Sequence, residues 1–401
     1  MNCRICQQKL TSPIVTLENM PLTDAFVNDN FLAGSNTQEF LEDIIIYECD
    51  NCRFVQNPNN FDYGSYYNDY NYSSGHSDFV KTFMREYAKK THEYLLNNAD
   101  NLSELRVLEV GSGDGEQLKE FLHLGFDVLG IEPSDFLVKE ATKSGVKTIK
   151  SLYDKSVLDQ QNIGKFDCIL SSFTFDHMPN PTEYLDVSYK LLKDGGLITF
   201  EIHDLDKIKE RGEFCLFEHE HTIYLNADDV SKLLEASGFR IISINPISQS
   251  HVRANSLIVF AQKTAGPCTP ALSTTVSHSD SKFDNLQTRI DRVTSRLNSW
   301  IEENSKYKQV VGYGVGGRGV MTLANVSNAG QIAAMFDANY QSGVLYTPKT
   351  HIPIFHSDDA RMYCDAIYIV FSFGYFDEIS EHLQKCGVAA ENIISLGMFY
   401  E

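Results

Sequence analysis

The chain has 401 residues, which is more than one ordinary domain holds and indicates two or three domains. Its 34 basic and 54 acidic side chains give a formal net charge of -20, which disfavours nucleic acid as a partner. No apolar run reaches the roughly 18 residues of a membrane span, and the N-terminus lacks an apolar signal core. We therefore expect a cytoplasmic protein with no membrane partner.

Two CxxC pairs occur near the start of the chain, Cys3 with Cys6 and Cys49 with Cys52. Each CxxC turn can present two thiolates to one ion, and two such turns complete the tetrahedral sulfur site that zinc prefers. Four protein ligands leave no open position, so we predict a structural zinc in a lobe too small to build its own core. The alternatives are buried free thiols or a redox pair. The redox pair is disfavoured because the first CxxC opens no βαβ unit.

Helical and strand patterns alternate between about residues 80 and 262. The continuous apolar character of a buried parallel strand is found in VLEVG, VLGIE, CILSS and LITFEI. Amphipathic segments lie between these runs, which is the βαβ rhythm of an α/β sheet.

A stretch rich in Ser, Thr and Pro, KTAGPCTPALSTTVSHSDSK, predicts a linker or an exposed loop. An amphipathic helix follows, and its apolar face comprises Leu286, Ile290, Val293, Leu297, Trp300 and Ile301. A second βαβ pattern begins at QVVGYGVGGRG and continues through AAMFD and AIYIVFS. We therefore predict an α/β fold of three parts: a zinc-binding lobe over 1–65, a Rossmann-like core over 66–265, and a Rossmann-like C-terminal domain with its connecting helix over 266–401.

A glycine-rich loop, GSGDG at residues 111–115, follows the first strand of the core directly. Glycines allow a sharp turn and a close approach to a ligand, and the next helix contributes free N–H groups. Glu132 ends the second strand about 20 residues later, a position that suits the hydroxyls of a ribose. From this loop alone the cofactor could be NAD or S-adenosylmethionine, and a plain tight turn is a further alternative.

The pattern as a whole resembles the class I methyltransferases, through VLEVGSGDG, GIEPS, FDCILSSFTFDHMPNP and LLKDGGLITFEI. The resemblance implies that the core binds S-adenosylmethionine. Gly111 and Gly113 would line the methionine end of this cofactor, and Glu132 would hold the ribose. The resemblance also implies that Pro133 and Leu152 lie near the adenine of the cofactor, and that Ser171 lies near its amino-acid part. We interpret His177 as capping a turn.

Further segments resemble the zinc-containing sugar C-methyltransferases, namely FCLFEHEH followed by Tyr224, RANSL, and MFDANYQSGVLYTPKTHIPIF near the C-terminus. The cysteine quartet belongs to this family too. Glu218 replaces a tyrosine that the family often has at this position, and the position is expected to lie near the substrate. The resemblance implies methylation of a carbon in a nucleotide-linked keto-deoxysugar, with thymidine diphosphate as the expected nucleotide. This substrate would lie between the core and the outer parts of the chain.

Methyl transfer to carbon requires that a proton first be removed from a carbon beside a carbonyl. We expect His221 to be the base, with Glu220 as its orienter or as a second acid/base group. Tyr72, or Tyr70 in a neighbouring alignment, resembles the family's active-site tyrosine. The alternatives for the EHEH segment are a metal site or a solvated loop.

A second glycine-rich loop, GYGVGG at residues 312–317, matches a dinucleotide fingerprint, and Asp337 ends the next strand. The family resemblance favours a vestigial loop over an NAD site. Three other functions stay open at this point: O- or N-methylation of a sugar or natural product, nonenzymatic S-adenosylmethionine binding, and NAD-linked sugar reduction.

Overall fold

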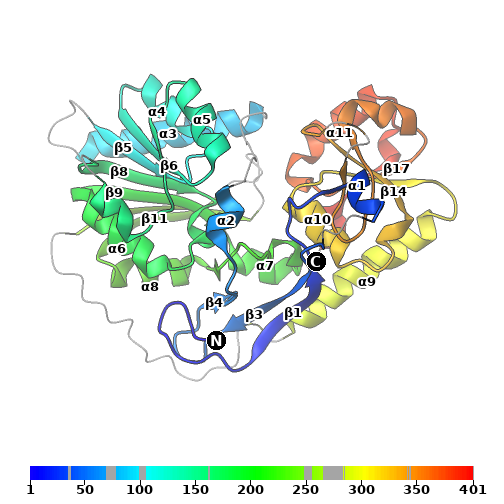
Figure 1. Ribbon diagram of the computed structural model, residues 1–401, viewed down its shortest axis with the longest axis horizontal. Helices are drawn as coiled ribbons and strands as arrows, with labels where there is room; N and C mark the ends of the chain where they lie inside the picture. The colour runs from blue at the N-terminus through cyan, green and yellow to red at the C-terminus, as the bar shows by residue number, and fades with distance from the viewer. Residues whose placement is uncertain are drawn as a thin grey trace.

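The computed structural model describes residues 1–34, 38–68, 78–98, 105–160, 163–247, 255–264, 283, 285–340, 342 and 345–400. Within these ranges the chain forms an α/β core, an N-terminal lobe and a C-terminal α/β domain (Figure 1). No helix in the described ranges has both the length and the apolar character needed to cross a bilayer.

The core is built on a sheet of seven described strands in the order β11-β12-β9-β8-β5-β6-β7. Its strands are β5 (Arg106–Val110), β6 (Asp127–Glu132), β7 (Thr148–Lys150), β8 (Phe166–Ser172), β9 (Leu192–His203), β11 (Phe239–Pro246) and β12 (Ser256–Lys263). The neighbours from β7 to β9 pair in parallel, and β12 pairs antiparallel with both β9 and β11. The four predicted core strands are therefore confirmed as β5, β6, β8 and β9.

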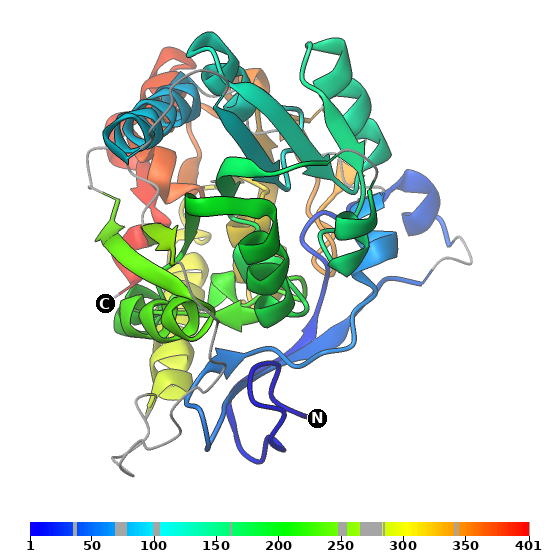
Figure 2. The ribbon, with the colours of Figure 1, turned by 90° about the vertical axis from the view of Figure 1, so that its left-hand side faces the viewer.

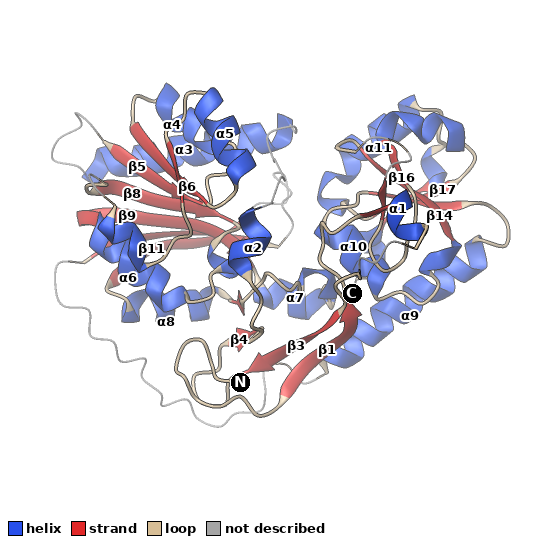
Figure 3. Cartoon of the chain, in the orientation of Figure 1, coloured by secondary structure: helices blue, strands red, loops and turns tan. Residues whose placement is uncertain are grey.

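Helices cover both faces of this sheet, as Figure 3 shows by colour. One face packs against α3 (Asp78–Asn98) and α4 (Glu116–His123), and the other against α6 (Pro181–Leu191) and α8 (Ala227–Ala236). The remaining helices near this sheet are α2 (Tyr63–Asn68), α5 (Asp135–Lys143) and α7 (Leu205–Arg211). Because both faces are covered, the strands carry the continuous apolar runs seen in the sequence.

The N-terminal lobe is a small antiparallel sheet, and Figure 2 shows its strands beneath the core. It contains β1 (Pro13–Met20), β3 (Glu42–Glu48), β4 (Val55–Gln56) and β10 (Ile223–Tyr224), in that order. A separate short strand, β2 (Val27–Asn28), precedes α1 (Asp29–Leu32) and pairs with β15 (Leu345–Tyr346). Strand pairing thus crosses both divisions proposed from the sequence, at residues 65 and 265, and those divisions stay predictions.

The C-terminal domain has five described parallel strands in the order β16-β14-β13-β17-β18. They are β13 (Val310–Tyr313), β14 (Ile332–Asp337), β16 (Ile354–His356), β17 (Ile367–Val370) and β18 (Ile393–Ser395), with helices α9 (Leu286–Asn304), α10 (Gly317–Ala324) and α11 (Phe376–Lys385). Helix α9 buries the predicted apolar face except Trp300, which is half-buried.

One apolar cluster joins the N-terminal lobe to the C-terminal domain through the segment after β9. This segment contains α7 and a short 3-10 turn, Phe214–Leu216, which packs against α10. Here Glu213 Oε1 pairs with Arg318 at 3.4 Å, and the Cys215 thiol lies 3.1 Å from the Tyr400 hydroxyl. The residues that follow this turn are the EHEH segment, so packing from all three parts of the chain positions it.

Candidate active site and zinc centre

The four cysteines predicted to bind zinc lie together. The Sγ atoms of Cys3 and Cys52 are 3.5 Å apart, as are those of Cys6 and Cys49, and all four lie within 4.8 Å of one another. A disulfide would need a separation of about 2 Å, whereas a tetrahedron with Zn–S bonds of about 2.3 Å has edges of about 3.8 Å. The donor set and spacing therefore fit zinc.

The two CxxC turns have the same backbone form. Gln7 and Arg53, the residues after each pair, have positive φ values of 63° and 64°. Each donates its N–H back to the first cysteine of its turn, to Cys3 O at 3.0 Å and Cys49 O at 2.9 Å. Gln56 Nε2 also donates to Cys3 Sγ at 3.1 Å, which suits a thiolate ligand. Two equivalent turns thus face one ion.

The first glycine-rich loop lies at the carboxyl end of β5, against the end of β8. Gly111 has a φ of +68°, and a Cβ atom there would lie 2.8 Å from Thr174 Cγ2. Any other residue at 111 would push the loop away from Thr174. Close by, Glu109 is buried and its Oε2 has no hydrogen-bond partner among the described residues. A partnerless acceptor beside such a loop fits a ligand with N–H and O–H donors, as S-adenosylmethionine has.

Glu132 ends β6 and faces the same loop. Its Oε2 accepts the Gly113 N–H at 3.0 Å, and its Oε1 accepts the Ser134 N–H at 2.9 Å. Burial raises the pKa of Glu132 above its ordinary value, and these two N–H groups act in the opposite direction. Each carboxylate oxygen has a second lone pair, so the side chain can still accept from ribose hydroxyls.

The other predicted cofactor residues differ in exposure. Pro133 follows Glu132 directly, and Leu152 is 41% exposed just beyond β7. Ser171 is fully buried, and its hydroxyl lies 3.0 Å from the Tyr184 hydroxyl. A contact from Ser171 to the cofactor would therefore come from its backbone. All six cofactor assignments stay predictions, namely those of Gly111, Gly113, Glu132, Pro133, Leu152 and Ser171.

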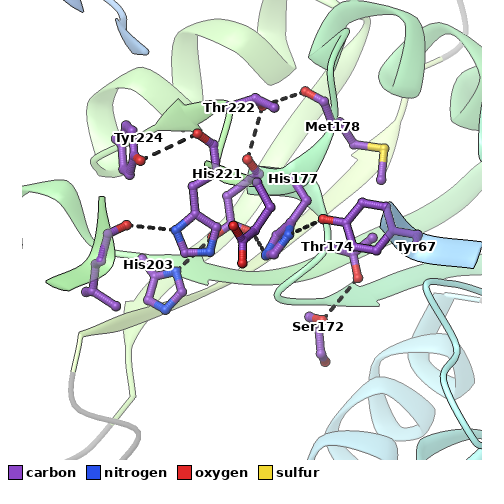
Figure 4. A network of polar contacts seen from close by, with 12 residues as sticks. Tyr67, Ser172, Thr174, His177, Met178, His203, His221, Thr222 and Tyr224 are labelled. Atoms are coloured by element: carbon purple, nitrogen blue, oxygen red, sulfur yellow. Dashed lines mark hydrogen bonds and ion pairs between the residues drawn. The ribbon is translucent and has the colours of Figure 1, made fainter. Parts of the chain in front are cut away.

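His221 is buried and lies between two half-buried histidines, His177 and His203, as Figure 4 shows. Its ring centroid is 4.5 Å from that of His177 and 5.2 Å from that of His203. His221 Nδ1 is 2.8 Å from the Leu216 carbonyl oxygen. The three histidines come from different segments, which meet at the carboxyl edge of the core sheet.

Asp176 connects two of these histidines. His203 Nδ1 is 2.8 Å from Asp176 Oδ2, and His177 Nε2 is 3.9 Å from Asp176 Oδ1. Burial favours the neutral acid, but the hydrogen bond and charge of His203 outweigh it and hold the pKa of Asp176 below its ordinary value. Burial, together with the charge on His221, lowers the pKa of His177 to about 4. His177 is therefore neutral near pH 7.

Glu220 is buried beside this cluster. Its Oε1 accepts from Thr23 Oγ1 at 2.9 Å and from the Tyr66 hydroxyl at 3.2 Å. Burial acts to raise the pKa of Glu220, but the charges on His221 and His177 outweigh it, and the pKa is lowered. Glu220 is thus a carboxylate that faces the histidines.

The EHEH segment does not converge on a single ion. His219 Nε2 is 3.0 Å from the Met20 carbonyl oxygen, and the ring packs against Phe40. A different trio, Asp176 with His177 and His221, places potential ligand atoms within 4.8 Å of one another. A metal count per chain, described in the Discussion, decides whether this trio binds an ion.

The predicted tyrosine, Tyr72, lies outside the described residues, as does Tyr70. Two neighbouring phenols do reach the site. The Tyr67 hydroxyl is 2.6 Å from His177 Nδ1, and the Tyr66 hydroxyl bonds to Asp24 and Glu220. The His177 imidazole thus lies between the Asp176 carboxylate and the Tyr67 phenol, two contacts that the interpretation as a turn cap did not include.

The sequence analysis did not identify Asp176, His203 or Tyr67 as site residues. A signal for the first two was present, because FDH lies just beyond β8 and the His203 of EIHD is the last residue of β9. Side chains just beyond the carboxyl ends of neighbouring parallel strands meet at the ligand edge of an α/β sheet. Tyr67 had no such signal, because it is 110 residues from its partner His177.

The second glycine-rich loop repeats the geometry of the first. The Val315 N–H donates to Asp337 Oδ2 at 3.0 Å, as Gly113 does to Glu132. Asp337 Oδ1 accepts the Asn339 N–H at 2.9 Å. The two loops are thus alike in backbone form, and this likeness makes Asp337 a matched control for Glu132.

Three family models match the chain in succession. They are a zinc-binding domain over residues 3–67, a methyltransferase domain over 80–244, and a C-methyltransferase C-terminal domain over 273–395. The C-methyltransferase NovU of Streptomyces niveus is 23% identical over 394 residues, covering 95% of this chain and 91% of that relative. The chain belongs to the family of zinc-containing, S-adenosylmethionine-dependent C-methyltransferases.

Other relatives match a smaller share of this C-methyltransferase. The ubiquinone biosynthesis O-methyltransferase of Caulobacter sp. (strain K31) is 30% identical over 121 residues, which cover 29% of this chain and 48% of that relative. Magnesium protoporphyrin IX methyltransferase from Synechocystis PCC 6803, solved with bound S-adenosylmethionine, is 17% identical, with a TM-score of 0.36. That structural match covers 48% of this chain and 88% of the other.

Proposed function

We propose that this C-methyltransferase methylates a carbon next to the ketone of a nucleotide-linked deoxysugar, with His221 as the base. S-adenosylmethionine, when bound, supplies an electrophilic methyl group. A carbon becomes nucleophilic enough to accept it once its proton is removed and the charge is delocalised onto the neighbouring carbonyl. The protein must therefore provide a base. Because this family methylates carbon, methyl transfer depends on that base.

The observation that carries the proposal is the contact between His221 and the Leu216 carbonyl. A carbonyl oxygen only accepts, so the 2.8 Å contact requires that His221 Nδ1 carry the hydrogen. Neutral imidazole then has its lone pair on Nε2. The backbone thereby presets the tautomer in which Nε2 can take a proton.

Glu220 supports this role by its charge. When His221 gains a proton it becomes an imidazolium, and the buried Glu220 carboxylate stabilises that charge. Thr23 and Tyr66 hold the carboxylate in place from outside the EHEH segment. Two phenols are candidates to donate a hydrogen bond to the developing oxyanion. One is Tyr67, whose hydroxyl contacts His177, and the other is the predicted residue Tyr72.

The nucleotide-sugar class rests on the resemblance of EHEH, of RANSL and of the C-terminal domain to the sugar C-methyltransferases. A screen of nucleotide-linked ketosugars with S-adenosylmethionine tests it. We expect one class of ketosugar to gain a single CH2 unit by mass, at a carbon adjacent to the ketone. Gain of mass at a hydroxyl or amine, or no gain with any ketosugar, would contradict the proposal.

The role of Glu132 in cofactor binding is testable separately. We expect Glu132→Ala to weaken S-adenosylmethionine binding by about 1–3 kcal/mol, the scale for hydrogen bonds to a charged group. Titration calorimetry measures this. Asp337→Ala is the matched control, because Asp337 holds the equivalent place in the C-terminal domain, and it should leave the affinity unchanged. Equal losses in the two variants would be evidence against the core loop as the cofactor site.

A further inference from the structure

Arg4 lies inside the first CxxC turn, at residues 3–6, and its half-buried side chain contacts backbone outside that turn. Its guanidinium donates to three carbonyl oxygens, those of Asn57 at 3.0 Å, Asn59 at 2.8 Å and Pro179 at 2.9 Å. An arginine can make these contacts together because it carries five N–H donors in a rigid fork. One side chain of the zinc turn therefore reaches two other segments of the protein.

The first of these segments, residues 57–59, holds the backbone around the proposed base. Asn57 Nδ2 donates to the Glu218 carbonyl oxygen at 3.2 Å. The Asn57 N–H donates to the Thr222 carbonyl oxygen at 3.0 Å. The two acceptors lie on either side of His221 in the sequence, so Asn57 fixes the backbone both before and after the base.

Asn59 adds a hydrogen bond to the same stretch of backbone. Its Nδ2 donates to the His219 carbonyl oxygen at 2.6 Å, and its Oδ1 accepts from the Tyr63 hydroxyl at 2.8 Å. Arg4 Nη2 lies 3.3 Å from the same Oδ1. The Asn59 amide therefore has one orientation, with its nitrogen toward the EHEH segment and its oxygen toward Arg4.

The second segment that Arg4 contacts is the one that follows β8. Pro179, whose carbonyl oxygen accepts from Arg4, follows His177 by two residues. Arg4 thus contacts the segment of His177 directly and the segment of His221 through residues 57–59. These are the two segments whose imidazole centroids lie 4.5 Å apart in the site.

Thr222 provides another link between the same two segments. Its N–H donates to the Asp176 carbonyl oxygen at 2.8 Å, and its hydroxyl donates to the Met178 carbonyl oxygen at 2.6 Å (Figure 4). This link is local to the site, whereas the link through Arg4 comes from the zinc turn. Two links hold the relative position of two segments better than one, because a single link leaves them free to rotate about it.

We propose that Arg4 is a positioning residue that connects the first CxxC turn to both histidine-bearing segments and so fixes the placement of His221 against His177. The proposal rests on the proposed function for the role of His221. Arg4 acts through backbone carbonyls and takes no part in the transfer of the proton or of the methyl group. The zinc turn, predicted to be structural, would thereby also affect the rate of methyl transfer.

Arg4→Lys tests this connection, and Arg53→Lys is its matched control. Lysine keeps the positive charge but offers its donors from a single nitrogen, so it cannot reproduce the fork that reaches three carbonyls. Arg53 lies beside the second CxxC turn, where it pairs with Glu48 at 2.9 Å. We expect both variants to keep about one zinc per chain and wild-type affinity for S-adenosylmethionine. Loss of zinc from Arg4→Lys would contradict the assignment, because the variant would then act through the metal site.

NMR of nitrogen-labelled histidine side chains gives a readout that needs no substrate. We expect the ring signals of His177 and His221 to shift in Arg4→Lys and to stay in place in Arg53→Lys. His221→Asn identifies the His221 signal by its absence. Unchanged ring signals in Arg4→Lys, or equal shifts in both lysine variants, would overturn the proposal. This result does not depend on the substrate class or on His221 being the base.

Steady-state kinetics test the consequence for catalysis. We expect Arg4→Lys to lower kcat about tenfold and to leave KM within about twofold, because a small displacement of a positioned group lowers the rate of the chemical step. Arg53→Lys should stay close to wild type in both constants. A raised KM with unchanged kcat, or equal losses of kcat in the two variants, would contradict a positioning role.

Asn59→Ala tests the next contact on the same route, and the exposed neighbour Asn60 provides the control variant Asn60→Ala. We expect Asn59→Ala to lower kcat and to shift the His221 ring signal, and Asn60→Ala to do neither. In the double variant with Arg4→Lys, the loss of kcat should be smaller than the product of the two single losses, because both residues act through one chain of contacts. Independent losses would refute this shared route. If Arg4→Lys does not fold, an unchanged His221 signal in Asn59→Ala would still overturn the proposal.

Discussion

His221→Asn should lower methyl transfer by at least 10²-fold, the scale of a general base. Asparagine keeps a donor for the Leu216 carbonyl, but its amide cannot take a proton near neutral pH, so the loss reports the base itself. S-adenosylmethionine should still bind with wild-type affinity, because His221 lies outside the loop at Gly111 and its partner Glu132. Single-turnover assays with the accepted ketosugar, alongside calorimetry for the cofactor, measure the two properties separately.

His219→Gln is the matched control for this variant. His219 is in the same segment and equally buried, but its Nε2 donates to the Met20 carbonyl and the ring packs away from the cluster. Glutamine can make the same hydrogen bond, so turnover should stay close to wild type. Near-normal turnover in His221→Asn, or an equal loss in both variants, would remove His221 from the role of base.

Removal of zinc should unfold the N-terminal lobe. Structural zinc sites carry apparent binding free energies of about 10–16 kcal/mol at neutral pH, and in such small lobes this binding energy is folding energy. Cys49→Ser should therefore produce a protein that is poorly soluble and melts at a lower temperature. Thermal melts with and without a strong chelator measure this. The matched control is Cys168→Ser, because Cys168 is a buried thiol of the core that lies outside the zinc cluster.

Metal analysis of the same preparations decides between two interpretations of the histidine cluster. The account requires about one zinc per chain, lost in Cys49→Ser. A second equivalent that is lost in Asp176→Asn would place an ion among Asp176, His177 and His221, and His221 could not then serve as a free base. A chelated protein that stays folded would contradict the structural role of the zinc.

The sequence predicted those features that local patterns encode. Continuous apolar runs predicted β5, β6, β8 and β9, because a strand covered on both faces has no polar side to alternate with. The cysteine quartet was predictable from its chemistry alone, although 42 residues separate Cys6 from Cys49. The pairing of β10 with β4 was not predictable, since two-residue strands carry no periodicity.

The contacts that shape the site lie far apart in the sequence. Tyr67 meets His177, and Glu218 meets Gly317, through packing between separate parts of the chain, and neither contact has a local signal. The interpretation of His177 as a turn cap did not include its contacts with Tyr67 and Asp176. Those contacts became visible once the ends of β8 and β9 were placed side by side. The residues that a loop contains can thus be predicted from the sequence, whereas contacts between distant loops are seen only in the folded structure.

Exchange of substrate hydrogen for deuterium tests the central claim, that a carbon next to the ketone is deprotonated by His221. The wild-type enzyme is incubated in heavy water with the ketosugar and S-adenosylhomocysteine, which has no methyl group to transfer. We expect deuterium at the carbon that is otherwise methylated, and at least 10²-fold slower exchange in His221→Asn. No exchange in the wild type, with methylation intact, or unchanged exchange in His221→Asn would contradict the account.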